Sequence, residues 1–263
     1  MNTNMIRNME QLTIIKVGGK IVEETDSLEK LLTDFASVSG NKILVHGGGR
    51  SATKMAGRLG FETKMVDGRR ITDDDMLDVV TMVYGGLVNK NIVAQLHRHG
   101  VKAIGMTGAD ADVIRSHRRP VVTIDYGHVG DVDACDATFL SSLIEQKIVP
   151  VMAPLTHDGQ GQLLNTNADT IAGEVAKAMA HKYDVTLIYC FEKKGVLMDA
   201  DDDESVIPHI SEPEFERLKQ QGIVQGGMIP KLENAFQALH QGVRKVVITR
   251  ADAITQNQGT IID

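Results

Sequence analysis

The sequence predicts an α/β fold organised around a mostly parallel β-sheet, and three observations support this prediction. Residues 14–17 form an apolar strand, and the apolar spacing of residues 27–38 is that of a helix. Residues 42–45 form a second short apolar strand, and a helix over about 51–59 follows it. Both strands also run directly into glycine-rich turns. Strands that alternate with helices in this order pair in parallel through right-handed crossovers.

The middle of the chain interrupts this alternation. Residues 63–72 form a short connector, and Thr72 is predicted to cap a long apolar helix that runs to about His99. A helix of this length and apolarity is a plain core helix, is central to the fold, or is shared with a partner subunit. Residues 101–104 are predicted to form a third core strand. Residues 113–132 alternate like one or two antiparallel hairpins outside the parallel sheet.

The remaining elements return to alternating strands and helices. A strand over 148–153 contains Pro150, which has no N–H for a sheet ladder and therefore predicts a strand end or an edge position. Because no low-complexity linker or internal repeat is present, the sequence marks no clear domain boundary. The other predicted elements are helices over 139–144, about 170–180, 212–220 and about 232–240, strands over 185–190 and 245–249, and a closing apolar segment at 259–262.

Composition and charge argue against several classes of protein. The chain has 263 residues, no Trp and only 4% aromatic residues, so stacking platforms for single-stranded nucleic acid are not expected. A net charge of −7 also argues against a nucleic-acid partner. No apolar run approaches the roughly 18 residues of a membrane span, and the polar N-terminus lacks the pattern of a signal peptide. We therefore expect a cytoplasmic protein without membrane contact.

A phosphate-binding site is indicated where the first strand ends. Lys16 lies among apolar neighbours, and Gly18 and Gly19 follow at once. Glycines let backbone N–H groups approach a ligand closely, and a cation beside free amides suits an anion, most naturally a phosphate. The alternative is an ordinary strand end whose lysine extends to solvent.

The glycine run at 47–49 has two interpretations. Three successive glycines are costly in backbone entropy, and close approach to a ligand at the N-terminus of the next helix explains them best. Gly47, Gly49 and Ala52, with Asp67 further along, also match a dinucleotide-binding pattern. Because that pattern does not explain the separate glycine pair after the first strand, a nicotinamide-dependent oxidoreductase is the weaker alternative.

Residues far apart in the sequence combine into one hypothesis of phosphoryl transfer. A third glycine pair, Gly226–Gly227, precedes a predicted helix, and such turns gather at the carboxyl edge of parallel strands. Lys16 and Lys231 would then flank the transferred phosphoryl group, and Asp169 would hold the lysines in register. Asp169 or the nearby Asn167 could instead be a helix N-cap. Phosphoryl transfer needs positioning and charge compensation, and the chain contains no Walker-type or protein-kinase motif.

Five motifs make the sequence similar to the amino-acid kinase family over nearly the whole chain, from about Leu12 to Thr260. Together they are specific to the family, although each alone is not. The resemblance is closest to those members that phosphorylate N-acetylglutamate with ATP in arginine biosynthesis. The motifs are K-V-G-G at 16–19, H-G-G-G at 46–49, R-I-T at 70–72, N-x-N-A-D at 165–169 and G-G-M-x-x-K at 226–231.

The resemblance implies a three-layer αβα sandwich whose mostly parallel central sheet has about eight strands. It implies an N-terminal lobe, residues 1–170, that binds the acyl-amino acid and forms a homodimer through the long helix. The C-terminal lobe, residues 171–263, would bind ATP, with Mg²⁺ carried by the nucleotide and no metal site made by the protein. The implied reaction converts N-acetyl-L-glutamate and ATP into N-acetyl-L-glutamyl 5-phosphate and ADP.

The resemblance also implies residue roles, by match of motif. One segment departs from the family: where a Thr/Ser-Asp-Val-x-Gly pattern is usual, this chain has Cys-Phe-Glu-Lys-Lys-Gly at 190–195. The adenosine contacts are therefore not fixed by the motif, although Gly195 remains. The implied catalytic residues are Lys16, Lys231 and Asp169, the implied substrate-binding residues are Gly48, Gly49, Arg70, Asn165 and Asn167, and the implied nucleotide-binding residues are Gly18, Gly19, Gly195 and Gly227.

The chemistry of such a reaction agrees with the residues present. The acceptor is a carboxylate with a pKa of about 4, so it is already ionised at neutral pH and needs no general base. His46 is therefore interpreted as a structural residue of the glycine turn. N-succinylglutamate is an alternative substrate, because no residue fixes the acyl group. A kinase of the same fold that acts on aspartate, glutamate or aminoadipate, and a non-catalytic sensor, are further alternatives; the lysines and the aspartate argue against the sensor.

Overall fold

A computed structural model describes residues 9–66, 68–256 and 258–263 of the chain, so the expectations for the extreme N-terminus and for Asp67 fall outside the described residues. The strands are β1 (Gln11–Val17), β2 (Asn41–His46), β3 (Met65–Val66), β4 (Arg69–Arg70), β5 (Ala103–Met106), β6 (Ile114–Arg118), β7 (Gly130–Cys135), β8 (Val149–Met152), β9 (Leu155–His157), β10 (Leu163–Asn165), β11 (Asp184–Phe191), β12 (His209–Ile210), β13 (Lys245–Arg250) and β14 (Thr260–Ile262). The helices are α1 (Gly19–Glu23), α2 (Thr25–Ser37), α3 (Gly49–Leu59), α4 (Asp74–Val80), η1 (Thr81–Val88), α5 (Asn89–Arg98), η2 (Asp110–Asp112), α6 (Ala137–Glu145), α7 (Ala168–Met179), α8 (Glu212–Gln220), α9 (Met228–His240) and η3 (Ala251–Ala253).

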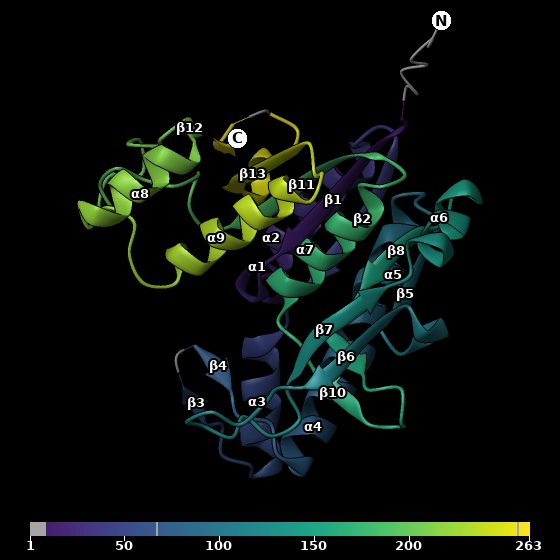
Figure 1. The fold of residues 1–263 in the computed structure, drawn as a ribbon. Coiled ribbons are helices and arrows are strands. Elements are labelled where there is room, and N and C mark those ends of the chain that lie inside the picture. Colours follow the sequence, from purple (N-terminus) through teal and green to yellow (C-terminus); the bar gives the residue numbers. More distant parts are fainter. Residues whose placement is uncertain (1–8, 67, 257) are drawn as a thin grey trace, which may run out of the picture.

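An eight-stranded sheet runs through the molecule in the order β12-β14-β13-β11-β1-β2-β8-β5. Neighbouring strands are parallel throughout, except that β13 and β14 are antiparallel. Helices cover both faces of this sheet (Figure 1). The predicted α/β class, the mostly parallel sheet of about eight strands and the three-layer αβα arrangement are therefore confirmed.

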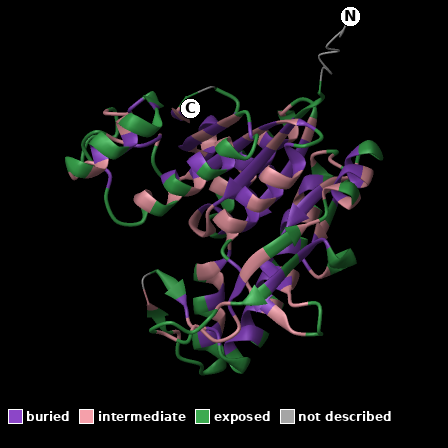
Figure 2. Ribbon diagram, viewed as in Figure 1, coloured by how far each residue is buried: buried purple, intermediate pink, exposed green. Residues whose placement is uncertain are grey.

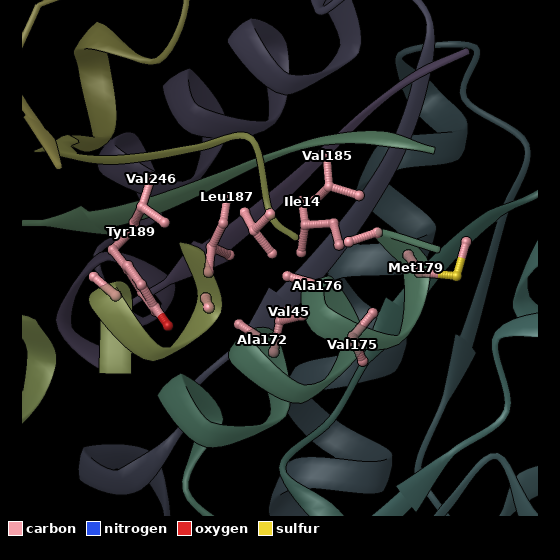
Figure 3. Packing of buried hydrophobic residues seen from close by; sticks show 14 of the residues in the cluster. Ile14, Val45, Ala172, Val175, Ala176, Met179, Val185, Leu187, Tyr189 and Val246 are labelled. Atoms are coloured by element: carbon pink, nitrogen blue, oxygen red, sulfur yellow. The ribbon is translucent and has the colours of Figure 1, made fainter. Parts of the chain in front are cut away.

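β1 lies at the centre of this sheet, and its burial on both faces explains its apolar sequence. Alternate side chains of a strand point to opposite faces. Ile14 belongs to the apolar cluster that contains the buried side of α7, and Ile15 belongs to the cluster that contains the buried side of α2. Figure 3 shows Ile14, Val45 and Leu187 packed against α7, and Figure 2 shows the buried residues concentrated along the sheet. Lys16 follows on the same face of the strand as Ile14 and is buried as well.

A smaller sheet in the order β10-β9-β6-β7 lies beside α4, at the end of the molecule away from β12 and α8 (Figure 1). β6 and β7 form an antiparallel hairpin, which confirms the prediction for 113–132. The hairpin of β3 and β4 lies in the segment predicted as a connector, and its two-residue strands are too short to produce a periodic pattern. Within the described ranges no helix is long and apolar enough to cross a membrane.

The predicted long helix is confirmed as the continuous run of α4, η1 and α5, but its central eight residues are π-helical. The prediction that Thr72 caps this helix was wrong. Asp73 is the N-cap, and its side chain accepts a hydrogen bond from Met76 N–H at 2.9 Å. Thr72 is instead fully buried, and its hydroxyl accepts a hydrogen bond from Asn165, which no local sequence rule predicts.

Of the two predictions for Pro150, the edge position was wrong, because β8 lies between β2 and β5. The strand end is confirmed, because Pro150 lies at the start of β8 as its second residue. The N–H groups of Val149 and Ala153 donate toward β5. Successive backbone groups alternate in direction, so Pro150 faces β2, whose pairing with β8 begins only at Val151. The missing N–H therefore leaves no gap in a ladder. The strand predicted in the core over 101–104 is β5, which forms the edge instead.

Candidate active site

The two glycine turns of the N-terminal half lie side by side at the carboxyl edge of the large sheet. β1 and β2 are in register with Val17 opposite His46, and Gly47 N–H donates to the Val17 carbonyl at 2.9 Å. A Cβ on Gly19 would lie 3.4 Å from Gly49 N, and a Cβ on Gly47 would lie 3.1 Å from Gly19 N. The turns therefore pack backbone against backbone, which side chains would prevent.

Lys16 and Asp169 form an ion pair at this edge. Lys16 is 6% exposed, and its Nζ lies 2.6 Å from Asp169 Oδ1. The contact is an ion pair rather than a hydrogen bond, because Asp169 Oδ1 accepts no hydrogen bond with acceptable angles from the described residues. Asp169 stands in the first turn of α7, where the helix dipole also favours a carboxylate.

Asn167 fixes where α7 begins. It is the N-cap, and its side-chain oxygen accepts hydrogen bonds from the N–H groups of Asp169 and Thr170 at 2.7 and 3.2 Å. The N-cap interpretation of Asn167 is confirmed, and its implied contact with a substrate stays a prediction. Because the cap sets the first turn of α7, it also sets the position of the Asp169 carboxylate.

Lys231 reaches the same place from the other end of the sequence. It stands in the first turn of α9, and its Nζ lies 3.7 Å from the centroid of the Phe191 ring. Lys16 Nζ lies 5.0 Å from the same centroid. Burial lowers the pKa of Lys231, an effect that Asp169 opposes and the charge of Lys16 reinforces. The structure thus brings together the three residues expected to be catalytic.

A cleft with a volume of about 450 Å³ opens next to these residues. Gly18, Gly19 and Gly195, all expected to bind the nucleotide, line it together with Lys231. The fourth expected residue, Gly227, is not among the lining residues, and α9 contributes Met228 and Lys231 instead. Gly195 has no room for a side chain, because a Cβ there would lie 2.7 Å from Thr260 Oγ1.

Three charged residues that sequence reasoning missed also line this cleft. The Glu192 carboxylate lies 2.9 Å from Lys20 Nζ and 3.7 Å from a guanidinium nitrogen of Arg50. The two cations directly follow the first and second glycine turns, a position that could have identified them. All three side chains are well exposed, so their pairing contributes little to stability and leaves the cations available to an anion.

Arg70 is held against the second glycine turn. It is 7% exposed, and its guanidinium donates to the Gly49 carbonyl at 2.7 Å and to Thr53 Oγ1 at 2.8 Å. Asn165 also lies in the N-terminal half, where its amide nitrogen donates to Thr72 Oγ1 at 2.9 Å. Each side chain is therefore anchored by neutral partners, and the guanidinium of Arg70 keeps its charge without a carboxylate partner among the described residues.

Tyr84 explains why position 48 is glycine. A Cβ at Gly48 would lie 2.8 Å from Tyr84 Cδ1, a distance that needs something to move. The φ of Gly48 is 170°, outside the left-handed region, so the argument for glycine at this position rests on the close contact. Tyr84 belongs to the π-helical segment η1 and is 5% exposed. No local signal in an apolar helix identifies it as a neighbour of the turn.

His46 anchors the same turn as a neutral ring. Its Nδ1 lies 2.7 Å from the Gly47 carbonyl, which can only accept, so Nδ1 carries the proton. Its Nε2 lies 3.1 Å from the Asn89 amide nitrogen, which can only donate, so Nε2 is unprotonated. Asn89 also donates to the Val151 carbonyl at 2.9 Å. The ring is fully buried, and this desolvation lowers the pKa of His46 to about 4.

This burial predicts a loss of stability in mild acid. The unfolded chain protonates His46 near pH 6.5, whereas the folded chain does so only near pH 4. Between these values the unfolded state binds an extra proton, so the free energy of unfolding falls as the pH falls, by about 3 kcal/mol in total. Urea unfolding at pH 7.5, 5.5 and 4.5 measures this slope. A His46→Gln variant should show a shallower slope, and an identical slope in both proteins would contradict the assignment.

The chain is similar to known proteins over nearly its whole length. Residues 11–250 match the amino acid kinase family. The chain is 66% identical over 253 residues to the acetylglutamate kinase of Bacteroides thetaiotaomicron, an alignment that covers 96% of this chain and 98% of that protein. It is 53% identical over 249 residues to the acetylglutamate kinase of Cytophaga hutchinsonii, with 94% of each chain covered. The crystal structure of smu.665 from Streptococcus mutans superposes with a TM-score of 0.79 at 27% identity, over 95% of this chain and 98% of that chain.

Proposed function

The chain belongs to the amino acid kinase family, and from this membership we propose that the cleft beside Lys16 and Lys231 is the site at which it phosphorylates N-acetylglutamate. The enzyme is an ATP-dependent kinase that acts on the side-chain carboxylate of N-acetyl-L-glutamate in arginine biosynthesis. Its products are N-acetyl-L-glutamyl 5-phosphate and ADP. The convergence of two lysines on the Phe191 ring, beside two glycine turns, carries the placement of the site.

The proposed mechanism compensates charge and moves no proton. A carboxylate oxygen of the substrate attacks the γ-phosphorus, and the bond from that phosphorus to the β,γ-bridging oxygen breaks as ADP leaves. Both reactants are anions, so their repulsion is a large part of the barrier. Lys16 and Lys231 offset it by placing two ammonium groups against the transferred group, and Asp169 holds Lys16 in place. The acceptor is already ionised at neutral pH, so no general base is required.

The acceptor is proposed to lie along the second glycine turn. The N–H groups of Gly48 and Gly49 would bind the substrate, and Arg70 would pair with a carboxylate of the substrate through charge-assisted hydrogen bonds. Asn165 would bind the other end, and Asn167 would also contact the substrate. The buried anchoring of Arg70 to Gly49 and Thr53 supports this placement, because a fixed guanidinium loses little entropy on binding.

The nucleotide is proposed to occupy the cleft, with Gly18, Gly19 and Gly195 along its walls and Gly227 near the start of α9. Asp169, the carboxylate beside the two lysines, is committed to Lys16. In the parts of the chain that the structure describes, no group of three or more His, Cys, Asp or Glu side chains is arranged to hold a metal ion. These residues fit a Mg²⁺ ion held mainly by phosphate oxygens and water, which neutralises phosphate charge. Residues 1–170 would bind the acceptor and contribute Gly18 and Gly19 to the nucleotide site, and residues 171–263 would form the rest of that site.

A homodimer in the cytoplasm, where ATP is available, completes the proposal. Met82 and Leu87 expose 54% and 49% of their surface on the long helix, and Ile104 exposes 41% on the edge strand β5. α5 continues η1 and packs beside β5, so the exposed apolar side chains lie on connected elements next to an unpaired sheet edge. Sedimentation equilibrium should report twice the chain mass, and a monomer at micromolar concentration would contradict the dimer.

A hydroxylamine-trapping assay tests the reaction directly, because hydroxylamine converts an acyl phosphate into a coloured hydroxamate complex with iron. With Mg-ATP we expect product from N-acetylglutamate and much less from glutamate or aspartate. A higher kcat/KM for N-succinylglutamate would assign the alternative acyl group, and a preference for a free amino acid would assign another kinase of this fold. A folded protein that gives no product with any of these acceptors would support a sensor and overturn the proposal.

A further inference from the structure

Phe191 occupies an unusual place in the site. It is the last residue of β11, in the segment where the sequence departs from the family pattern. Its ring lies under two cations at once, with Lys231 Nζ at 3.7 Å and Lys16 Nζ at 5.0 Å from its centroid. It also lines the cleft proposed for the nucleotide. A single uncharged side chain therefore contacts both lysines.

A buried aromatic neighbour supports the ring in this place. Phe191 and Tyr189 point to the same face of β11, and their rings stack at 6.2 Å with an interplanar angle of 9°. Tyr189 is 1% exposed, and its hydroxyl donates to the Asp169 carbonyl at 3.3 Å. The stack thus connects the floor of the site to the turn of α7 that carries the Asp169 carboxylate. The ring therefore packs against a fully buried neighbour, Tyr189, that does not change place easily.

The two lysines need a partner that attracts cations without removing their donors. Lys16 has the Asp169 carboxylate, but Lys231 forms no ion pair among the described residues. A carboxylate beneath Lys231 would accept its N–H groups and would repel the phosphates. An aliphatic side chain would leave the ammonium free to turn toward solvent. The face of an aromatic ring attracts the cation through its quadrupole and accepts no conventional hydrogen bond.

Building on the proposed function, we propose that Phe191 is a positioning residue for phosphoryl transfer, whose ring holds the ammonium groups of Lys16 and Lys231 side by side with their N–H donors free for the phosphoryl oxygens. Phe191 itself makes no bond to the reacting atoms. Its contribution is to keep Lys231 in the reactive position before the substrates arrive, which lowers the barrier rather than strengthening nucleotide binding.

Three variants of the full-length protein test this role in the hydroxylamine assay. Phe191→Leu should lower kcat by about tenfold, since two cation–π contacts are lost, and should change the KM for ATP by less than about twofold. Phe191→Tyr retains the ring face and should keep kcat within about threefold of the original protein. Phe215→Leu is the matched control, because Phe215 is a buried ring that packs against Phe236, with centroids 5.6 Å apart and an interplanar angle of 32°, and does not line the cleft.

The pH dependence of kcat separates positioning from a merely structural role. The charged groups that face Lys231 are Lys16 from β1 and Asp169 from α7, while Glu192 and Lys193 also line the cleft. Burial already lowers the pKa of Lys231, and the ring face stabilises its ammonium form, so Phe191→Leu should lower that pKa further. The basic limb of the kcat profile should then move to lower pH, and Phe215→Leu should leave it in place.

Each other outcome overturns the inference in a recognisable way. An unchanged kcat with a raised KM for ATP would make Phe191 a stacking platform for the base. Equal losses in Phe191→Leu and Phe191→Tyr would make the fit of the ring, not its face, the important property. If the original protein forms no acyl phosphate, the proposed function fails; if it is active and Phe191→Leu matches it, only the positioning role fails.

Discussion

Replacing Lys231 by methionine is expected to lower kcat by at least about 10³-fold and to leave the free energy of unfolding unchanged or slightly higher. Methionine keeps an unbranched apolar side chain of similar reach but removes the charge. In the folded protein the ammonium group packs on Phe191 and forms no ion pair among the described residues. Burial lowers the pKa of Lys231, which means that folding disfavours its charged form. Stability therefore gains nothing from the charge, and only the transition state needs it.

Lys219→Met is the matched control for this experiment. Lys219 also lies over a phenylalanine, with its Nζ 5.5 Å from the Phe215 centroid, but it stands on α8 and does not line the cleft. Its activity should equal that of the original protein. Steady-state kinetics and urea unfolding on the same preparations give both quantities. A Lys231→Met variant that keeps more than a tenth of the original kcat, or that loses activity because it unfolds, would contradict the role given to Lys231.

Sequence reasoning succeeded where chemistry and a strand end coincide within a few residues. Lys16 lies in a strand so apolar that a buried lysine there needs a partner. Two glycines follow shortly after it in the sequence, and an ordinary turn does not require both. A parallel sheet brings such strand ends to one edge. That rule was sufficient to expect Lys16, Asp169 and Lys231 together, although 62 residues or more separate them in the chain.

The rest depends on neighbours that the sequence does not name. Pro150 indicates an edge strand only if both sides of β8 pair along their whole length, and the pairing with β2 starts after it. Thr72 has a side chain suited to a helix cap, but this side chain is buried and hydrogen-bonded to Asn165, and Asp73 is the N-cap instead. Tyr84 reaches Gly48 from a π-helical turn, which changes the face that a helical side chain presents.

Lys16→Met should also lower kcat, by about 10³-fold. Unlike Lys231→Met, it should destabilise the protein. The two side chains of the Lys16–Asp169 pair are 8% and 15% exposed. Removing the lysine leaves a carboxylate partly buried without its counter-ion, which costs about 2–3 kcal/mol. The helix dipole and the solvent that reaches Asp169 keep this cost below that of a fully buried charge. The two lysines should thus be distinguished by their effects on stability, although we expect catalysis to need both.

A double-mutant cycle turns this difference into a strict test. Asp169→Asn alone leaves Lys16 buried and unpaired, so it should also destabilise the protein. Lys16→Met/Asp169→Asn removes both charges, so its loss in free energy of unfolding should be smaller than the sum of the two single losses by at least about 1 kcal/mol. Activity should not recover, and the double variant should be no worse than Lys16→Met, because Asp169 acts through the lysine that is already gone. The corresponding cycle on Lys177 and Glu174, an ion pair further along α7, should leave kcat unchanged. If the factors by which the two single changes lower kcat instead multiply in the double variant, Asp169 contributes to the reaction independently, for example by holding the nucleotide's metal ion.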